Sequence, residues 1–290
     1  MRQLDLVSLS FAVEEPGKLD AFCKKCGSKR VVWNGRYRKH HHKYECKRCG
    51  GQGVFAGSDL FKMRKPAQAI ALAVELYSSS GLSYHLIARL LLQYLGVRVS
   101  HTAVYYWVQK GANSPWIPKL EPAQSPVWHV DETMVRVNKQ WMWLFIVWCP
   151  FNKLVLSWKL SKERSYNDTV EVLHKAVDNA GFRPREIVTD GFGAYIGAVK
   201  KVMGHKYVKH TVESGLGHNN PIERQNREVK RRVKWFASFR TLESANNFLT
   251  LFFFVKNFRK PCRAISWLTP AYTAGITQRT VAELFKNHPP

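Results

Sequence analysis

The chain divides into stretches with different hydrophobic periods. Between Ala67 and Lys110, apolar residues recur at helical spacing, which predicts a group of short α-helices. From Val127 the pattern changes to alternation through "SPVWHVDETMVRVNKQWMWLFIVWCPFNKLVLSWKLS", which predicts three strands with turns at "NKQ" and "CPFNK". Strand and helix patterns then follow each other as far as about Trp267. The sequence therefore predicts an α/β protein with a helical module in front of it.

Further elements follow the three strands. "SYNDTVEVLHKAVDNAGF" predicts a helix, and "REIVTDGFGAY" predicts a short strand that ends at Asp190. "HKYVKHTV" predicts another strand, after which Asn220 caps a helix that has Pro221 at its first position. "TLESANNFLTLFFFVKNFRK" is apolar enough for a buried helix that covers the sheet. An interface between two copies of the chain is the alternative for this last segment.

Three short helices fit the helical module. Pro66 suits a first turn, Ser83 and Ser100 are good N-caps, and Gly111 ends the third helix. Three helices of this size, with a short turn before the last, are typical of a helix-turn-helix, whose third helix enters the major groove of DNA. The expected DNA-reading residues are His101, Thr102 and Tyr105. The alternative is a helical spacer packed on the following domain.

Composition sets the domain boundaries. Residues 1–20 carry no readable signal, and residues 21–65 form a basic block that holds four of the six cysteines. Residues 66–112 are the helical module. The stretch "GANSPWIPKLEPAQSP" contains four prolines, which predicts a linker over residues 113–126. Residues 127–290 then form the α/β domain with its C-terminal helices.

Two close cysteine pairs stand in the basic block. "CKKCGSKRVVWNGRYRKHHHKYECKRCGG" contains Cys23, Cys26, Cys46 and Cys49 as two C-x-x-C turns. Each turn presents two thiolates to one ion. Two strands between the turns bring the second pair to the same ion, which completes a tetrahedral site. The pattern predicts a zinc ribbon. Its Zn²⁺ would be structural, because four sulfur ligands leave no open position for chemistry.

The charge balance favours a polyanionic partner. The chain has 45 Lys and Arg against 21 Asp and Glu, a formal net charge of +24, and basic side chains release counterions when they neutralise phosphates. DNA is the first candidate partner, and an anionic membrane surface is the second. The longest apolar runs, "WMWLFIVWC" and "FLTLFFFV", are well below the roughly 18 residues of a spanning helix.

The lone cysteines and the start of the chain bear on the compartment. Cys149 and Cys262 stand alone in apolar surroundings, as small core residues do, and the four paired cysteines do not form a secreted disulfide framework. The first residues contain Asp5 and no clean apolar core, which makes a poor signal peptide. We therefore expect a soluble, cytoplasmic, nucleoid-associated protein without a membrane partner.

Three acids stand out from their surroundings. Asp131 lies inside the first strand among apolar residues, where a charged carboxylate needs a partner or a metal, and alternation sends Glu132 to the opposite face. Asp190 ends a short apolar strand before two glycines, where ligands of open α/β sheets bind. Glu223 falls at the third position of its helix. The alternatives stay open: Asp190 as a plain turn residue, and Glu223 in a capping box with Asn220.

Basic residues follow Glu223 along its helix. Helical spacing places three of them within about 40° of Glu223 around the helix axis. Such a stripe is either a solvated helix face or a path for a DNA backbone. The candidate phosphate contacts are Arg227, Lys230 and Lys234, with Arg231 beside them. Glu228 points about 140° away from Glu223, so if one of these two glutamates is a metal ligand, the other is not.

Three blocks together resemble a known family. "WHVDET", "VTDGFGAY" and "NNPIERQNREVKRR" are similar to the signature blocks of prokaryotic DDE insertion-sequence transposases, and most similar to those of the insertion sequence six family. The similarity runs from about Trp128 to Trp267, and the three blocks in this order are far more specific than any one alone. Many relatives have an acid and a histidine where this chain has Gln225 and Asn226. That departure questions an accessory role for these two positions and leaves the three acids untouched.

The resemblance implies a ribonuclease H-like fold of the retroviral-integrase type: a mixed five-stranded sheet, with three antiparallel strands first, flanked by helices. It implies that Asp131, Asp190 and Glu223 are catalytic acids that hold two Mg²⁺ (or Mn²⁺) ions about 4 Å apart. Asp131 would bridge the ions, and Asp190 and Glu223 would each hold one.

The resemblance also implies an activity. A DNA transposase would bind the ends of an insertion sequence, nick them and join the 3′-hydroxyl ends to target DNA. Because two ends must be paired, we expect a homodimer or higher oligomer on DNA. Two alternatives are a ribonuclease H-like nuclease without strand transfer and a DNA-binding regulator with an inactive catalytic domain.

Overall fold

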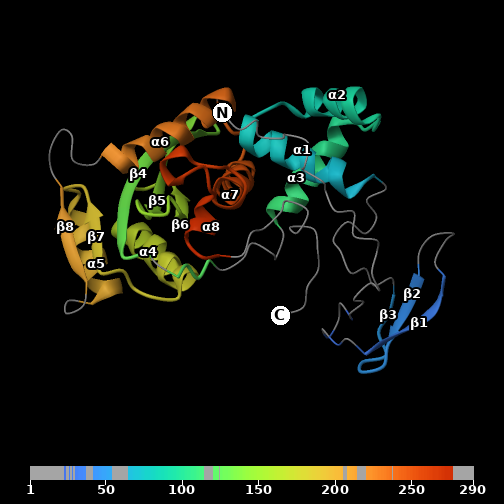
Figure 1. Ribbon diagram of the computed structural model, residues 1–290, viewed down its shortest axis with the longest axis horizontal. Coiled ribbons are helices and arrows are strands. Elements are labelled where there is room, and N and C mark those ends of the chain that lie inside the picture. The colour runs from blue at the N-terminus through green and yellow to red at the C-terminus, as the bar shows by residue number, and fades with distance from the viewer. Residues whose placement is uncertain are drawn as a thin grey trace. The chain divides into compact units, whose positions relative to one another are not determined.

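The computed structural model (Figure 1) describes most of the chain. The described residues are Cys23, Cys26, Ser28, 30–36, 42–53, 65–113, 120–123, 125–204, 208–213, 220–236 and 238–276. The chain divides into two units: Met1–Met63 with Lys286–Pro290, and Arg64–Phe285. The unassigned segment 1–20 and residues 114–119 of the expected linker lie outside the described residues.

A small antiparallel sheet forms the described part of the first unit. Its strands are β1 (Val31–Arg36), β2 (His42–Cys46) and β3 (Gln52–Gly53), in the order β1-β2-β3. In the β1–β2 hairpin, Val31 lies opposite Cys46 and Trp33 lies opposite Tyr44. The hairpin therefore returns the chain to its starting end, so that Cys46 closes β2 beside the first residue of β1.

Three helices open the second unit. They are α1 (Ala67–Ser80), α2 (Tyr84–Leu95) and α3 (His101–Ala112). The expected caps form: Ser83 Oγ accepts a hydrogen bond from the backbone N of Leu86, and Ser100 Oγ accepts one from the backbone N of Ala103. Gly96 ends α2 with φ of +64°, a conformation that glycine adopts without strain. The turns on both sides of α2 thus fix the three-helix arrangement.

Five strands form the sheet of the second unit. They are β4 (Val127–Val137), β5 (Gln140–Trp148), β6 (Val155–Ser161), β7 (Glu186–Thr189) and β8 (Lys209–Val212). Their order is β6-β5-β4-β7-β8. The first three strands are antiparallel, whereas β7 runs parallel to β4 and β8 parallel to β7. This is the mixed sheet that the resemblance implies, and the ribonuclease H-like fold class is confirmed.

Helices cover both faces of this sheet. They are α4 (Tyr166–Ala180) and α5 (Gly193–Met203) on one face, and α6 (Asn220–Val233) and α7 (Leu242–Phe258) on the other. Neighbouring residues of β6 distinguish the faces. Ser157 Oγ donates a 2.7 Å hydrogen bond to the carbonyl of Val172 in α4, whereas the ring centroid of Trp158 lies 5.8 Å from that of Phe253 in α7. Alternation along a strand thus separates the two helical layers.

The remaining helical elements are short. They are η1 (Lys234–Phe236), η2 (Arg263–Ile265) and α8 (Pro270–Thr273). No helix in the described part of the chain is long and apolar enough to cross a lipid bilayer.

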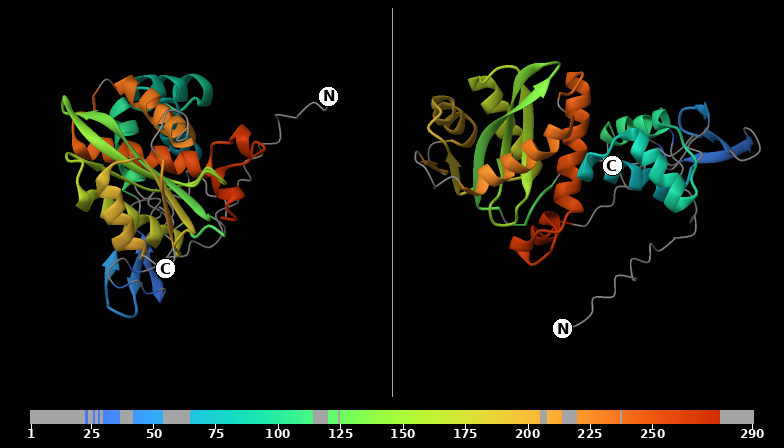
Figure 2. Two further views of the ribbon diagram at one scale, coloured as in Figure 1. Left: turned by 90° about the vertical axis from the view of Figure 1, so that its left-hand side faces the viewer. Right: turned by 90° about the horizontal axis from the view of Figure 1, so that it is seen from above.

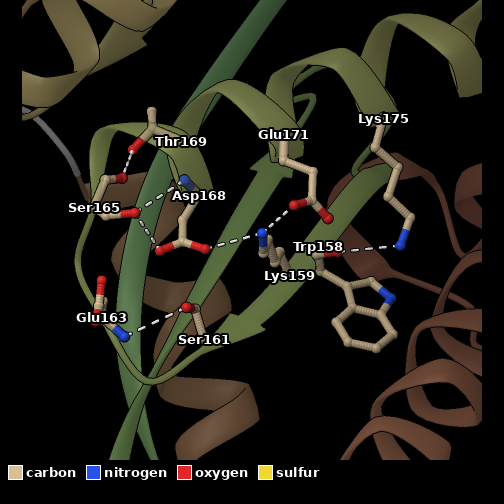
Figure 3. Close-up of polar contacts among 9 residues, drawn as sticks. All are labelled: Trp158, Lys159, Ser161, Glu163, Ser165, Asp168, Thr169, Glu171 and Lys175. Atoms are coloured by element: carbon tan, nitrogen blue, oxygen red, sulfur yellow. Dashed lines mark hydrogen bonds and ion pairs between the residues drawn. The ribbon is translucent and has the colours of Figure 1, made fainter.

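Polar contacts fasten the start of α4 to β6 (Figure 3). Ser165 Oγ accepts a 3.2 Å hydrogen bond from the backbone N of Asp168 and donates a 2.6 Å hydrogen bond to its carboxylate. Lys159 Nζ, from β6, lies 2.9 Å from Asp168 Oδ1 and also pairs with Glu171. Asp168 is buried. The first turn of α4, and the loop residues that enter it, are therefore held against the sheet.

α7 lies between the sheet and the helical module, as the right-hand view of Figure 2 shows. Asn247 Nδ2 donates a hydrogen bond to Gln109 Oε1 of α3. At the other end of α7, Asn257 Oδ1 accepts a 3.0 Å hydrogen bond from the backbone N of Val155 in β6. The prediction of a buried helix that covers the sheet is confirmed, and the surface considered for an interface between two copies is covered within the chain.

Candidate active site

Asp131 and Asp190 meet beside the end of β7. The last pair between the two parallel strands joins Val130 of β4 to Thr189 of β7, so Asp190, the next residue, comes beside Asp131. One carboxylate oxygen from each of Asp131, Asp190 and Glu132 lies within 4.8 Å of the others. Oxygen ligands from carboxylates at this spacing suit a hard divalent cation.

The environment of Asp131 disfavours its charge. Burial raises the pKa of its carboxyl most, and the negative charges of Asp190 and Glu223 raise it further, to about 7. The positive charges of Arg164 and Lys230 act in the opposite direction. A divalent cation would supply the missing positive charge and favour the ionised carboxylate.

Glu223 lies in the first turn of α6, on an exposed position. α6 packs against β4, and the charge of Glu223 acts on Asp131. Its carboxylate is not in the group whose oxygens lie within 4.8 Å of one another. The capping-box alternative depends on the side chain of Asn220, which lies outside the described side chains. Both roles of Glu223 therefore stay predictions.

Asn226 is a site residue that sequence reasoning missed. Its Nδ2 donates a 2.6 Å hydrogen bond to Asp131 Oδ2, and its side chain is buried. The departure from the family pattern had questioned an accessory role here, but Asn226 contacts Asp131 in spite of that departure. Helical spacing could have identified Asn226, because it follows Glu223 by three residues and therefore lies on the same side of α6.

Glu132 belongs to the other face of the sheet, as alternation predicts. Its carboxylate accepts a hydrogen bond from the hydroxyl of Tyr195 in α5 and forms an ion pair with Arg164. Arg164 Nη2 also lies 3.3 Å from Asp190 Oδ2. β7 ends at Thr189, before this level of the sheet. The carboxylate of Glu132 therefore comes close to those of Asp131 and Asp190, although the Glu132 side chain points to the other face.

Comparison with known proteins finds a family model and several relatives. Residues 125–261 match a family model described as a DDE domain. A Staphylococcus aureus transposase for the insertion sequence-like element IS431mec is 28% identical over 181 residues, which is 60% of this chain and 78% of the relative. The transposase for the insertion sequence element IS257 in transposon Tn4003, also from Staphylococcus aureus, gives the same values. Residues 125–261 are therefore a DDE domain, and the chain is similar to insertion-sequence transposases.

Solved structures also resemble this chain. The catalytic core domain of HTLV-2 integrase in complex with magnesium, in its trimeric form, is 18% identical, with a TM-score of 0.42, over 52% of this chain and 96% of that chain. The simian T-cell lymphotropic virus intasome in complex with the PP2A regulatory subunit B56 gamma is 17% identical, with a TM-score of 0.43, over 71% and 75% of the two chains.

The DDE family implies a divalent metal cofactor, and this chain has residues that fit one. The carboxylates of Asp131 and Asp190 supply oxygen ligands at a shared position. Burial first, and then neighbouring negative charge, raises the pKa of Asp131, and a bound cation would favour its ionised form. Both features fit a bound divalent cation.

Glu228 does not join the acids of the candidate site. Its carboxylate pairs with Lys256 and Lys260 at the junction of α6 with α7. Burial acts to raise the pKa of Glu228, but the charge of Lys256 and the hydrogen bonds from both lysines outweigh it, and the pKa falls to about 2. Glu228 is therefore an ionised structural partner between two helices.

Basic side chains of α6 lie on the surface of the protein. Arg227, Lys230 and Arg231 are exposed, and Arg227 and Arg231 line a cavity of about 280 Å³ together with Glu228 and Lys260. Lys234, the last residue of the expected stripe, directly follows the end of α6 at Val233 and begins the 3₁₀ turn η1. It is exposed like the other three.

The three expected DNA readers lie on the exposed start of α3. The His101 ring stacks on His85 of α2, with centroids 3.9 Å apart, and Thr102 Oγ1 lies 3.4 Å from His101 Nε2. Tyr105 is 41% exposed and its neighbour Tyr106 is 64% exposed. The surface of α3 therefore offers aromatic and polar groups to a partner, and which of them reads DNA stays a prediction.

The four paired cysteines converge in the first unit. Cys23 Sγ lies 3.5 Å from Cys49 Sγ, and Cys26 Sγ lies 3.6 Å from Cys46 Sγ. One ligand atom from each lies within 4.8 Å of the others. A tetrahedral ion with metal–sulfur bonds of about 2.3 Å separates its sulfurs by about 3.8 Å. The cluster therefore fits one metal ion, and sequence spacing alone found all four cysteines.

Proposed function

We propose that the transposase binds the ends of its insertion sequence, nicks them, and joins the 3′-hydroxyl ends to target DNA at one active site formed by Asp131, Asp190 and Glu223. The observation that carries this proposal is that carboxylate oxygens of Asp131 and Asp190 lie close together. In addition, α6 packs on β4, and the charge of Glu223 acts on Asp131. Glu223 lies at the exposed side of this meeting point.

The three acids would hold two Mg²⁺ (or Mn²⁺) ions. Asp131 would contact both ions, and Asp190 and Glu223 would each contact one. When bound, such ions activate an attacking oxygen and stabilise the leaving oxygen of a phosphodiester. The chain supplies the orientation: Asn226 donates to Asp131 Oδ2, and the backbone N of Phe192 donates a 3.0 Å hydrogen bond to Asp190 Oδ1. Carboxylates held in this way lose less freedom on binding.

DNA would contact two surfaces of the transposase. The exposed cations of α6 and η1 would hold phosphates beside the acids, because point charges bind a backbone without reading bases. These residues are Arg227, Lys230, Arg231 and Lys234. The start of α3 would enter the major groove, with His101, Thr102 and Tyr105 near the bases. Two ends must be paired, and we propose a homodimer or higher oligomer on DNA at the nucleoid in the cytoplasm.

The domain plan follows from the same proposal. Residues 21–65 would be a zinc ribbon with Cys23, Cys26, Cys46 and Cys49 around one structural Zn²⁺, which four sulfurs hold without an open position. Residues 66–112 would be the helix-turn-helix module. Residues 127–290 would form the ribonuclease H-like catalytic domain with its C-terminal helices.

The test uses DNA that carries the sequences flanking the transposase's own gene, with Mg²⁺. Glu223→Gln keeps the length of the side chain and its ability to accept a capping hydrogen bond, but it removes the charge that a metal needs. The matched control is Glu243→Gln, because Glu243 is an exposed acid in the first turn of α7. We expect Glu223→Gln to bind DNA and melt like wild type but to lose nicking and joining, and the control to keep both.

Other outcomes separate the alternatives. Wild-type nicking by Glu223→Gln would remove Glu223 from the site, and Glu132 would then be the next acid to examine, because its carboxylate lies within the group around Asp131. Nicking without joining by the wild-type protein would indicate a nuclease without strand transfer. DNA binding without nicking would indicate a regulator.

A further inference from the structure

Glu132 has protein partners for both of its carboxylate oxygens. Oε2 accepts a hydrogen bond from the hydroxyl of Tyr195, and Oε1 forms an ion pair with Arg164 Nη2. The side chain of Glu132 is only 3% exposed, and Tyr195 is fully buried. A carboxylate buried to this degree is stable when its oxygens are occupied, as they are here.

Arg164 connects this buried carboxylate to Asp190. The same nitrogen, Nη2, that pairs with Glu132 lies 3.3 Å from Asp190 Oδ2. The guanidinium is held over two aromatic rings, with its Cζ 3.7 Å from the ring centroid of Phe192 and 5.1 Å from that of Trp143. These rings orient the plane of the guanidinium. Arg164 is therefore a fixed link between Glu132 and Asp190.

The chain around Arg164 is also fixed. Arg164 directly precedes Ser165, the N-cap of α4, and the contacts of Ser165, Asp168 and Lys159 hold this turn on β6 (Figure 3). Asp190 is fixed from its other side, because the backbone N of Phe192 donates to Oδ1. Both oxygens of Asp190 thus have a donor, one from Phe192 and one from Arg164.

We propose that Glu132 is a positioning residue for Asp190 that acts through Arg164, and is not itself a metal ligand. The inference rests on the proposed function, in which Asp190 holds a metal ion. Residues that orient a metal ligand set its geometry, and their loss typically lowers metal affinity or activity by about 10- to 100-fold. A liganding role would take Glu132 away from Tyr195 and Arg164 and leave a buried hydroxyl and a guanidinium without their partner.

A double-mutant cycle tests the link. The variants are Glu132→Gln, Arg164→Met and their combination, and the readout is the Mg²⁺ concentration that gives half-maximal nicking, with DNA affinity and thermal unfolding measured alongside. The matched control is Glu163→Gln, because Glu163 is an exposed acid of the same loop. We expect each single change to raise the half-maximal concentration by about 10-fold or more with DNA affinity within about twofold, and the control to do nothing.

The double variant shows whether Glu132 acts through Arg164 or independently of it. If Glu132 acts through Arg164, the double variant is no worse than the more severe single variant, because the second change removes a link already broken. If the two effects multiply, to about 100-fold or more, Glu132 acts independently, and the proposal is overturned. A wild-type Mg²⁺ requirement in Glu132→Gln also overturns it.

Two further variants distinguish a failure of the positioning role from a failure of the proposed function. Tyr195→Phe removes one donor to Glu132 at nearly constant volume, and it replaces Glu132→Gln as the test if Glu132→Gln does not fold. We expect Tyr195→Phe to raise the half-maximal Mg²⁺ concentration several-fold. An unchanged value overturns the inference. Asp131→Asn tests the proposed function itself. Nicking by Asp131→Asn would end that function, whereas an inactive Asp131→Asn beside an unaffected Glu132→Gln ends only the positioning role.

Discussion

Asn226 Nδ2 donates a hydrogen bond of 2.6 Å to Asp131 Oδ2 and so ties α6 to the centre of β4. This contact fixes the rotation of Asp131. Among the described residues, no donor reaches the other polar atom of the amide, Asn226 Oδ1, which is buried. The amide therefore has one firm partner, and that partner is a catalytic acid in the proposed function.

Replacing Asn226 should affect catalysis more than DNA binding. Asn226→Ala removes the donor to Asp131, and we expect nicking to fall by about 10- to 100-fold, as for other residues that orient metal ligands. Affinity for the element end, measured by gel shift without metal, should stay within about twofold. Asn167→Ala, an exposed asparagine of α4, is the control. Nicking by Asn226→Ala within twofold of wild type would show that Asp131 needs no such support.

Asp131 should make the metal-free protein less stable as the pH rises from about 4 to about 7. Burial first, and then the charges of Asp190 and Glu223, raise the pKa of Asp131 to about 7, whereas the unfolded chain titrates near 4. Between these values the folded protein keeps a proton that the unfolded chain releases. The free energy of unfolding therefore falls with rising pH, by up to about 1.4 kcal/mol per pH unit.

Urea unfolding in EDTA measures this effect. Asp131→Asn carries no titrating group, so the difference between wild type and Asp131→Asn isolates Asp131 from the other acids. Above pH 7, Mg²⁺ should stabilise wild type and not the variant, because the ionised acids bind it. Equal pH dependence in both proteins would contradict the raised pKa.

Local patterns predicted the strands and the capped helices, because they depend on neighbours in sequence. Alternation around Asp131 was enough to place Glu132 on the other face, and Ser83 and Ser100 cap the helices that they were expected to cap. Residue contacts between distant segments could not be predicted in this way. Arg164 is polar and sits in a loop, and nothing beside it in the sequence indicates that Glu132 and Asp190 are its partners.

Glu228 should stabilise the fold and leave the chemistry alone. Its carboxylate is 16% exposed and pairs with Lys256, which is 10% exposed. Glu228→Gln leaves the Lys256 charge buried with a neutral partner, and we expect a loss of about 3 kcal/mol in the free energy of unfolding at pH 7. Lys260→Met is the control, because Lys260 is 42% exposed and such a pair is worth less than about 1 kcal/mol.

The Glu228 effect has its own pH signature. The pKa of Glu228 falls to about 2, against the effect of burial, because of Lys256 and Lys260. Its contribution should therefore be complete above the unfolded pKa of about 4.3 and disappear as the pH falls towards 2. Urea unfolding between pH 7 and pH 3 checks this. A constant difference between wild type and Glu228→Gln over that range would contradict the ion pair.

The zinc site should hold one ion per chain. Cys46→Ser replaces a buried sulfur of the four-cysteine cluster, and a Ser oxygen is a poor substitute for a thiolate on Zn²⁺. We expect metal analysis of the purified protein to find about one zinc ion in wild type and much less in Cys46→Ser. Cys262→Ser is the control, because Cys262 lies outside the cluster. Equal zinc in Cys46→Ser would contradict the ribbon.

Base reading by α3 should be separable from phosphate binding by α6. Thr102 and His101 are exposed at the start of α3, and loss of a base contact costs about 1–3 kcal/mol of discrimination. We expect Thr102→Ala and His101→Ala to weaken binding to the element end by about 5- to 150-fold and to leave binding to unrelated duplex DNA unchanged. Gln93→Ala, an exposed residue of α2, serves as the control.

Lys230→Ala should behave in the opposite way. Lys230 is exposed on α6, and a phosphate contact carries no sequence information, so both duplexes should bind more weakly by the same factor. The slope of log affinity against log salt should fall by about 1, because one counterion fewer is released. Fluorescence anisotropy with both duplexes at several salt concentrations measures all of these quantities. Equal losses on both duplexes for the α3 variants would show that α3 contacts only the backbone, and the helical module would then be a spacer or a non-specific clamp.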